Sequence, residues 1–234
     1  MRPLAPVFVL VAALGLAATA HAETIAVIGT GNVGQALGPE FAAQGHTIIY
    51  GSREPNREDV QALVARTAGN ASAAQPADAA ARASVVVLAV PGTAAEEVTR
   101  SLGDLSGKII IDPTNRVDRS GGVMRHGVPG ETSNAELIQA AAPGARVVKA
   151  FNTLNVAQMV DPETAGGPIT IMLAGDDAEA KAFVAELVEG MGLHAVDIGP
   201  LFYSDTLEEM LILWANSLGS PDRFNYYLRP WPAN

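Results

Sequence analysis

A short stretch near the N-terminus, residues 24–34, limits the fold more than any other part of this chain. It reads Thr-Ile-Ala-Val-Ile-Gly-Thr-Gly-Asn-Val-Gly, an apolar run followed by glycines with the spacing G-x-G-x-x-G. An apolar run without alternation is typical of a buried parallel strand, and residues 35–44 after it are helix-like. Between a strand and a helix, the motif predicts a dinucleotide-binding loop. The alternative is a glycine-rich turn that binds nothing.

Each glycine has a separate task in such a loop. Gly29 permits the tight turn, Gly31 lets the backbone approach a pyrophosphate, and Gly34 lets the helix pack close to the strand. The N-terminus of the helix then directs free N–H groups and a partial positive charge at the phosphates.

The first 150 residues continue as alternating strand-like and helix-like segments. Strands are expected at residues 46–50, 71–73, 85–90, 108–112 and 146–150, and helices at 58–66, 76–82, 94–101 and 133–142. Residues 121–130 are glycine-rich and polar, and are expected to form a loop. Such alternation predicts an α/β fold of the Rossmann type, a doubly wound, mostly parallel sheet with right-handed crossovers.

The pattern changes after residue 150. Strands are expected at residues 169–174 and 193–198, with helices at 178–189 and 206–218. We therefore divide the chain into a signal peptide over residues 1–22, a Rossmann domain over 23–150 and a small C-terminal α+β extension over 151–234.

Residues 1–22 are interpreted as a Sec-type signal peptide. Arg2 supplies a positive charge, residues 7–18 are apolar, and Ala20-His21-Ala22 has the small-x-small pattern of a cleavage site. Cleavage after Ala22 predicts a periplasmic or secreted protein. The apolar run is short for a membrane span, so no span is expected in the mature chain. The alternatives are an uncleaved anchor or a wrongly chosen start codon.

Composition excludes several classes of function. The formal net charge of −10 argues against a general nucleic-acid binder, which needs clustered Lys and Arg. The chain has no Cys, which excludes disulfides, thiolate metal ligands and a Cys nucleophile. It lacks the G-x-S-x-G elbow of many hydrolases. We found no His and carboxylate groups at metal-ligand spacing and expect no metal.

The end of the second expected strand indicates which dinucleotide is bound. NAD-binding folds usually carry Asp or Glu there, to accept a hydrogen bond from the ribose 2′-OH. This chain has Ser52 and Arg53, with Arg57 four residues later. Arg can donate two parallel hydrogen bonds to a phosphate, and a Ser hydroxyl can donate one. We expect NADP(H) rather than NAD(H), against the alternative of an exposed charged loop.

The sequence resembles the dinucleotide-binding enzymes typified by the F420-dependent NADP reductases. The most specific matches are Val-Lys-Ala-Phe-Asn-Thr at residues 148–153 and Ala-Gly-Asp-Asp at 174–177. Further matching segments follow in order at residues 28–34, 51–53, 86–91, 107–115, 197–201, 207–208 and 213–214. The resemblance covers nearly all of the mature chain, and the chain is also similar to the NADPH module of membrane metalloreductases.

This resemblance implies hydride transfer between the nicotinamide and a flat acceptor, with F420, FMN and FAD as candidates. It also implies that residues 151–234 help to form the acceptor pocket. A homodimer through the C-terminal helix is kept open. Such a reaction needs no protein nucleophile, because the cofactor carries the chemistry and the protein supplies geometry and excludes water.

The residues expected at the cofactor fall into four groups. They are Gly29, Thr30, Gly31, Asn32, Val33 and Gly34 at the phosphates; Ser52, Arg53 and Arg57 at the 2′-phosphate; Ala89, Val90 and Pro91 beside the ribose and nicotinamide; and Asn115, Ala150, Phe151 and Asn152 at the ends of later strands. The backbone of Ala150 is the candidate for orienting the carboxamide.

The catalytic residues are unknown at this stage. Lys149 ends a buried strand and is a weak candidate for general acid work, since burial lowers the pKa of a lysine; the alternative is a structural lysine bound to carbonyl groups. His126 is expected to be a solvated loop residue. Ser204 and Asp205 stand where the family usually carries Ala-Arg, which removes a cation and adds an anion.

Together these observations predict an exported NADP(H)-dependent oxidoreductase with a flavin- or deazaflavin-like acceptor. One alternative is an exported NADP-binding protein without turnover, acting as a sensor or partner subunit. Another is an NADPH-dependent ferric or flavin reductase module.

Overall fold

The fold is that of a computed structural model, which describes residues 22–127 and 132–231. The expected signal peptide lies outside the described residues, except for Ala22. Within the described ranges, no helix is long and apolar enough to cross a membrane.

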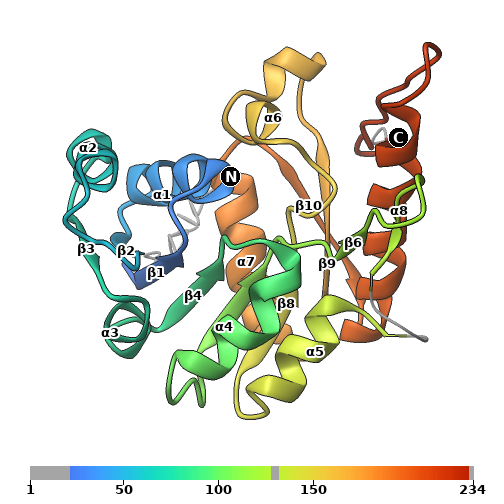
Figure 1. The fold of residues 1–234 in the computed structure, drawn as a ribbon. Helices are drawn as coiled ribbons and strands as arrows, with labels where there is room; N and C mark the ends of the chain where they lie inside the picture. The colour runs from blue at the N-terminus through green and yellow to red at the C-terminus, as the bar shows by residue number, and fades with distance from the viewer. Residues whose placement is uncertain (1–21, 128–131, 232–234) are drawn as a thin grey trace, which may run out of the picture.

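The main sheet has eight strands and is flanked by helices (Figure 1). Its strands are β1 Thr24–Ile28, β2 Thr47–Gly51, β3 Ala71–Ala74, β4 Val85–Leu88, β5 Ile109–Asp112, β8 Arg146–Lys149, β9 Thr170–Gly175 and β10 His194–Gly199. The helices are α1 Asn32–Ala43, α2 Glu58–Arg66, α3 Pro76–Ala81, α4 Ala95–Ser101, α5 Asn134–Ala141, α6 Val156–Val160, α7 Ala178–Gly190 and α8 Ser204–Ser217. A separate two-stranded ribbon pairs β6 Val117–Asp118 with β7 Arg125–His126.

The strand order is β10-β9-β8-β5-β4-β1-β2-β3. All neighbouring strands are parallel except β8 and β9. From β1 the chain builds outward through β2 and β3, then returns to add β4 on the other side of β1. The order therefore reverses between β1 and β4, and in open α/β sheets ligands bind at the carboxyl ends of the strands at such a point. The structure confirms the predicted Rossmann-type fold.

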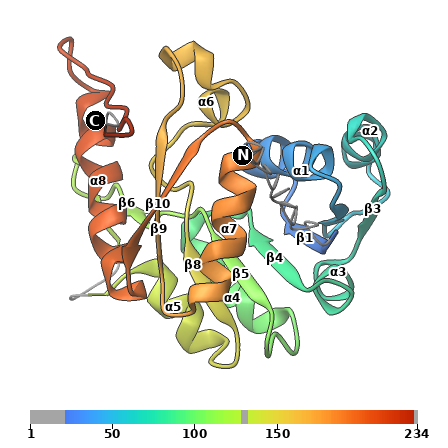
Figure 2. The same ribbon diagram turned by 180° about the vertical axis from the view of Figure 1, so that it is seen from behind.

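The sheet is covered on both faces, which explains its apolar strands. Ile25 and Val27 of β1 belong to a core shared with α1, α6 and α7. Ala26 and Ile28 face the other way, into a core shared with α3, α4 and α5. Figures 1 and 2 show these two helical layers from opposite sides. Successive side chains of a strand point to opposite faces, so a strand buried on both faces needs apolar residues at every position.

The C-terminal extension continues the same sheet. β9 turns the chain antiparallel to β8, and β10 then pairs parallel with β9. α8 packs against α5 and β7. Residue 150 therefore marks a change of strand direction within one sheet.

Several boundaries differ from the sequence-based expectation. α1 begins at Asn32, three residues earlier than predicted, so the last glycine of the motif, Gly34, lies within the first turn of the helix. The prediction of a loop over residues 121–130 is wrong at Arg125 and His126, which pair with β6. α6 was not predicted, since its single turn shows too little periodicity. Residues 133–136, Ser-Asn-Ala-Glu, have the sequence pattern of a capping box, and α5 begins with one: the side chains of Ser133 and Glu136 each accept a hydrogen bond from the other's backbone N–H.

Candidate functional site

A cleft of about 510 Å³ lies at the carboxyl ends of β1, β2 and β4. It is called the switch-point cleft below, because it lies where the strand order reverses. Nine of the residues expected at the cofactor line it: Gly29, Thr30, Gly31, Ser52, Arg53, Arg57, Ala89, Val90 and Pro91. These residues come from three strand ends that are far apart in the sequence, and the fold brings them to one opening.

The glycine loop has the geometry that close approach of a ligand requires. Gly29 adopts φ +106°, and its N–H donates to the carbonyl of Gly51 at 2.9 Å. A Cβ at Gly29 would overlap the carbonyl oxygen of Ala89, and one at Gly34 would overlap the carbonyl oxygen of Gly29. The space over Gly31 is open, because nothing lies within 4 Å of its Cβ position. The loop is therefore closely packed against the protein at Gly29 and Gly34, and open to a ligand at Gly31.

The N-terminus of α1 opens beside this loop. Its N-cap residue, Gly31, has no side chain to cap the helix, and the first turn contains no acidic residue. The first N–H groups of a helix lack partners within the helix, and together with the helix dipole they favour an anion. Asn32 and Val33 belong to this first turn, outside the cleft lining, and Gly34 is buried.

The end of β2 supplies the basic side of the cleft. Arg53 is exposed, and the buried hydroxyl of Ser52 accepts a hydrogen bond from the N–H of Glu54 at 3.2 Å. Arg57 forms two hydrogen bonds with Asp59, at 2.5 and 2.9 Å. Both side chains of this pair are exposed, and such pairs contribute little to stability. Arg57 can therefore exchange Asp59 for a phosphate at small cost.

The remaining expected residues form a separate group at the ends of β5 and β8. Ala150 and Phe151 are buried. The Asn115 side chain donates to the Asn152 carbonyl at 2.9 Å, and the Asn152 side chain donates back to Asn115 Oδ1 at 3.0 Å. A Cβ at Gly92 would overlap the backbone of Asn115, so this group adjoins the segment that follows Pro91. Asn115 is half-buried and is the member with the most open side chain.

Phe151 has an unusual backbone. Its φ of +64° makes it the one non-glycine residue in the left-handed region within the described ranges. Such a conformation costs of order 1 to 3 kcal/mol and persists only where surrounding structure imposes it. Here the Asn115–Asn152 pair and the hydrogen bond from Asn152 to the carbonyl of Leu207, at 2.8 Å, hold the turn.

A buried ion group, the lysine cluster, lies behind this turn. Lys149 Nζ donates to Asp112 Oδ2 at 2.9 Å, to the Thr114 carbonyl at 2.6 Å and to Glu208 Oε1 at 2.6 Å. The side chains of Lys149, Asp112 and Glu208 are fully buried. An ammonium group has three N–H donors, so all of them are used within the protein.

The protonation of Lys149 differs from the sequence-based expectation. Burial alone lowers its pKa, but the charges and hydrogen bonds of Asp112 and Glu208 outweigh burial, and the pKa is raised. The prediction of a lowered pKa is therefore wrong. A lysine that keeps its proton and has no free N–H is suited to positioning other groups rather than to proton transfer.

His126 also differs from expectation, because it is not solvated. Its side chain is 7% exposed, and Nε2 lies 2.7 Å from Glu208 Oε2. The hydrogen bond with Glu208 raises its pKa against the opposing effect of burial, and Asp205 and Glu209 add to the rise. Glu208 also accepts from the N–H of Asn134 at 3.0 Å.

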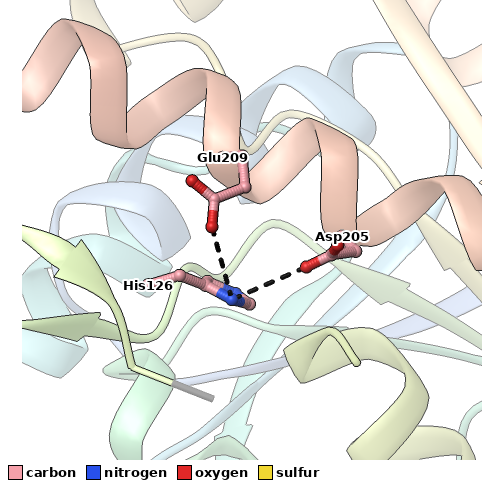
Figure 3. A group of neighbouring side chains, drawn as sticks. All are labelled: His126, Asp205 and Glu209. Carbon is pink, nitrogen blue, oxygen red and sulfur yellow. Dashed lines mark ion pairs between the residues drawn. The ribbon is translucent and has the colours of Figure 1, made fainter. Parts of the chain in front are cut away.

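The structure also contains a group of metal-ligand type that was not expected from the sequence, called the histidine cluster below. Ligand atoms of His126, Asp205 and Glu209 lie within 4.8 Å of one another (Figure 3). The statement that no His and carboxylate groups have suitable spacing is therefore wrong. Asp205 and Glu209 are four residues apart on a helix, a spacing that places both on one face and was readable from the sequence. The contribution of His126, about 80 residues earlier, was not.

The sequence and the fold are similar to those of known NADP reductases. Residues 24–116 match the model of the family described as NADP oxidoreductase, coenzyme F420-dependent. The F420-dependent NADP reductase of Methanothermobacter thermautotrophicus is 32% identical over 208 residues, which cover 82% of this chain and 88% of that protein. A crystal structure from Arthrobacter sp. FB24, proposed to be an F420-dependent NADP reductase, has a TM-score of 0.79 at 32% identity and covers 89% of this chain and 99% of its own.

A third similarity is to part of a larger protein. Metalloreductase STEAP3 of Rattus norvegicus is 27% identical over 185 residues. The match covers 77% of this chain but only 35% of the metalloreductase.

We predict that Lys149→Met strongly destabilises the fold. The substitution leaves two carboxylates buried without their cation, and breaking a buried ion pair in this way costs about 3–5 kcal/mol. Denaturant unfolding measures the loss. Lys181→Met is the matched control, because the side chain of Lys181 is also largely buried, but its partner Asp197 is 53% exposed and water can solvate that carboxylate when the lysine is lost. The control should therefore lose less stability than Lys149→Met. Similar small losses for both variants would contradict a structural role for Lys149.

We also predict a pH-dependent contribution of His126 to stability. A pKa raised on folding stabilises the protein fully below the unfolded value of about 6.5, and this contribution disappears as pH rises through the folded pKa. His126→Gln should therefore reduce the free energy of unfolding more at about pH 5.5 than at about pH 9. The pH dependence of unfolding in denaturant provides the measurement.

His46→Gln is the control for this effect, because burial lowers the pKa of His46. A lowered pKa favours the neutral form on folding, so its contribution should change with pH in the opposite direction. The same pH trend in both variants would contradict the assignment.

Proposed function

The chain belongs to the family of F420-dependent NADP oxidoreductases, and we propose that it transfers hydride between NADP(H) and a flat, flavin- or deazaflavin-like acceptor. The observation that carries this proposal is the switch-point cleft, where the glycine loop and the basic end of β2 line the same opening. The first feature suits a pyrophosphate and the second suits a 2′-phosphate.

The residues at the cleft divide the work of cofactor binding. Gly31 and the first turn of α1 would hold the pyrophosphate through backbone N–H groups. Ser52, Arg53 and Arg57 would hold the 2′-phosphate. The end of β4 lines the cleft with Ala89, Val90 and Pro91, beside the Asn115–Asn152 pair. The ribose and nicotinamide would lie along these residues.

NADP(H) supplies hydride chemistry when it is bound. The protein then has to orient the reacting face and exclude water, because a near-attack geometry lowers the barrier without a protein nucleophile. The Asn115 side chain, held by Asn152, is the polar group best placed to fix the nicotinamide end. Lys149 supports this edge from behind through the carbonyl of Thr114.

The acceptor is proposed from the family. F420 is named for the Methanothermobacter relative, and FMN and FAD are candidates on chemical grounds because their rings are similarly flat. A ferric or flavin reductase module is a further possibility suggested by the metalloreductase, of which this chain matches 35%.

A second candidate function is an NADP-binding protein without turnover. It is favoured by Ser204 and Asp205, which stand where the family usually carries Ala-Arg and so replace a cation with an anion, and by the expected export signal. Export through the signal peptide at residues 1–22 and a homodimer through α8 are proposals that apply to either function.

The experiment that tests the function uses the chain from Glu23 onward. NADPH and NADH are titrated first, and NADPH oxidation is then followed with F420, FMN, FAD and ferric chelates as acceptors. Oxidation with one of them supports the enzyme. Tight NADPH binding without oxidation by any of them would favour the protein without turnover.

We predict that Arg53→Asp weakens NADPH binding much more than NADH binding. A hydrogen bond to a charged group contributes about 1.5–3 kcal/mol, or about a tenfold to 100-fold change in the dissociation constant. An aspartate at this position also repels the 2′-phosphate, and it can accept from the ribose 2′-OH of NADH.

Arg82→Asp is the matched control, because Arg82 is exposed at the end of α3, outside the cleft lining. It makes the same change of charge and should leave the preference for NADPH unchanged. Equal losses of NADPH and NADH affinity in Arg53→Asp would refute the 2′-phosphate role.

A further inference from the structure

We propose that the histidine cluster, His126 with Asp205 and Glu209, binds a divalent first-row transition-metal ion of the Zn²⁺ class. The cluster joins two parts of the fold. His126 lies on β7, and the two carboxylates lie one turn apart on α8, which packs against β7. It is separate from the switch-point cleft, whose lining contains none of the three residues.

The distances within the cluster suit ligands of one metal better than hydrogen bonds. His126 Nδ1 lies 3.6 Å from Asp205 Oδ1 and 3.9 Å from Glu209 Oε1. Both separations exceed the usual hydrogen-bond range. Two ligand atoms held about 2.1 Å from one zinc ion at tetrahedral or wider angles lie about 3.4–4.2 Å apart. Figure 3 shows both carboxylates directed at the same ring nitrogen.

Glu208 sets the tautomer that a metal needs. Its Oε2 lies 2.7 Å from His126 Nε2, so in the neutral imidazole the proton is held on Nε2 and the lone pair lies on Nδ1. A ligating histidine usually donates its other N–H to a carboxylate or carbonyl in this manner. Glu208 is itself fixed, because it also accepts from Lys149 and from the N–H of Asn134.

The second ring nitrogen of His126, Nδ1, is the observation that points to a ligand. The His126 side chain is more than nine-tenths buried. Nδ1 makes no hydrogen bond within the part of the chain that the structure describes. A proton or a metal ion at Nδ1 would face the carboxylates of Asp205 and Glu209 and offset their negative charge, so the two compete for the site.

The donor set indicates the class of metal. One imidazole nitrogen and two carboxylate oxygens suit zinc and its first-row neighbours better than Mg²⁺ or Ca²⁺, which prefer oxygen alone. Asp205 and Glu209 are 37% and 54% exposed, so an ion can enter from solvent. Three protein ligands also leave a coordination position for water, as in catalytic zinc sites.

The test is calorimetric titration of Zn²⁺ into untagged protein that has been treated with EDTA. We expect one ion per chain. Asp205→Asn/Glu209→Gln should weaken binding by at least about 100-fold, since loss of an outer-shell partner alone costs about 10–100-fold. Both side chains are partly exposed, so the fold should be kept, and circular dichroism checks this.

Two further variants complete the design. Glu179→Gln/Glu189→Gln removes the same two charges from exposed positions of α7 and should leave zinc affinity within about twofold of the wild type. Co²⁺ gives a visible absorption band when bound by nitrogen and oxygen ligands, and His126→Gln should abolish it. The proposal is overturned if the wild type binds no Zn²⁺ at about 1 mM, a very weak affinity, or if it binds no tighter than Asp205→Asn/Glu209→Gln.

Discussion

The ammonium group of Lys149, at the end of β8, forms ion pairs with two buried carboxylates that come from different parts of the chain. Asp112 ends the neighbouring strand β5, and Glu208 lies on α8 near the C-terminus. Each charge is tolerated in the interior only because the others are present. The cluster therefore ties α8 to the carboxyl edge of the sheet, which is the edge where open α/β folds bind their ligands.

The switch-point cleft and the Asn115–Asn152 pair beside it depend on α8 to different degrees. The switch-point cleft is built from backbone: a glycine turn, an uncapped helix N-terminus and the ends of three strands. Its shape follows from the parallel sheet and needs little from α8. The Asn115–Asn152 pair beside it does depend on α8, because Asn152 also donates to the carbonyl of Leu207.

α8 places carboxylates at both ring nitrogens of His126. Glu208 faces inward, where it accepts from Lys149 and contacts His126. Asp205 and Glu209 face the other nitrogen of the same imidazole. His126 thus lies between the buried lysine cluster and solvent. An ion or proton at Nδ1 is linked to Lys149 through two short hydrogen bonds, one between His126 and Glu208 and one from Lys149 to Glu208. This arrangement gives α8 a role beyond covering the core.

The sequence by itself determined the features that local patterns encode: the alternation of strands and helices, the glycine loop, the capping box and the basic end of β2. Each depends on residues within a few positions of one another, where periodicity and turn chemistry act. Only the tertiary structure decided the partners of Lys149, the burial of His126 and the grouping of Asp205 and Glu209 around it. Lys149 and His126 contact Glu208 from 59 and 82 positions away in the sequence. The residues next to a charged side chain in the sequence do not reveal whether its partner will be water or a distant side chain.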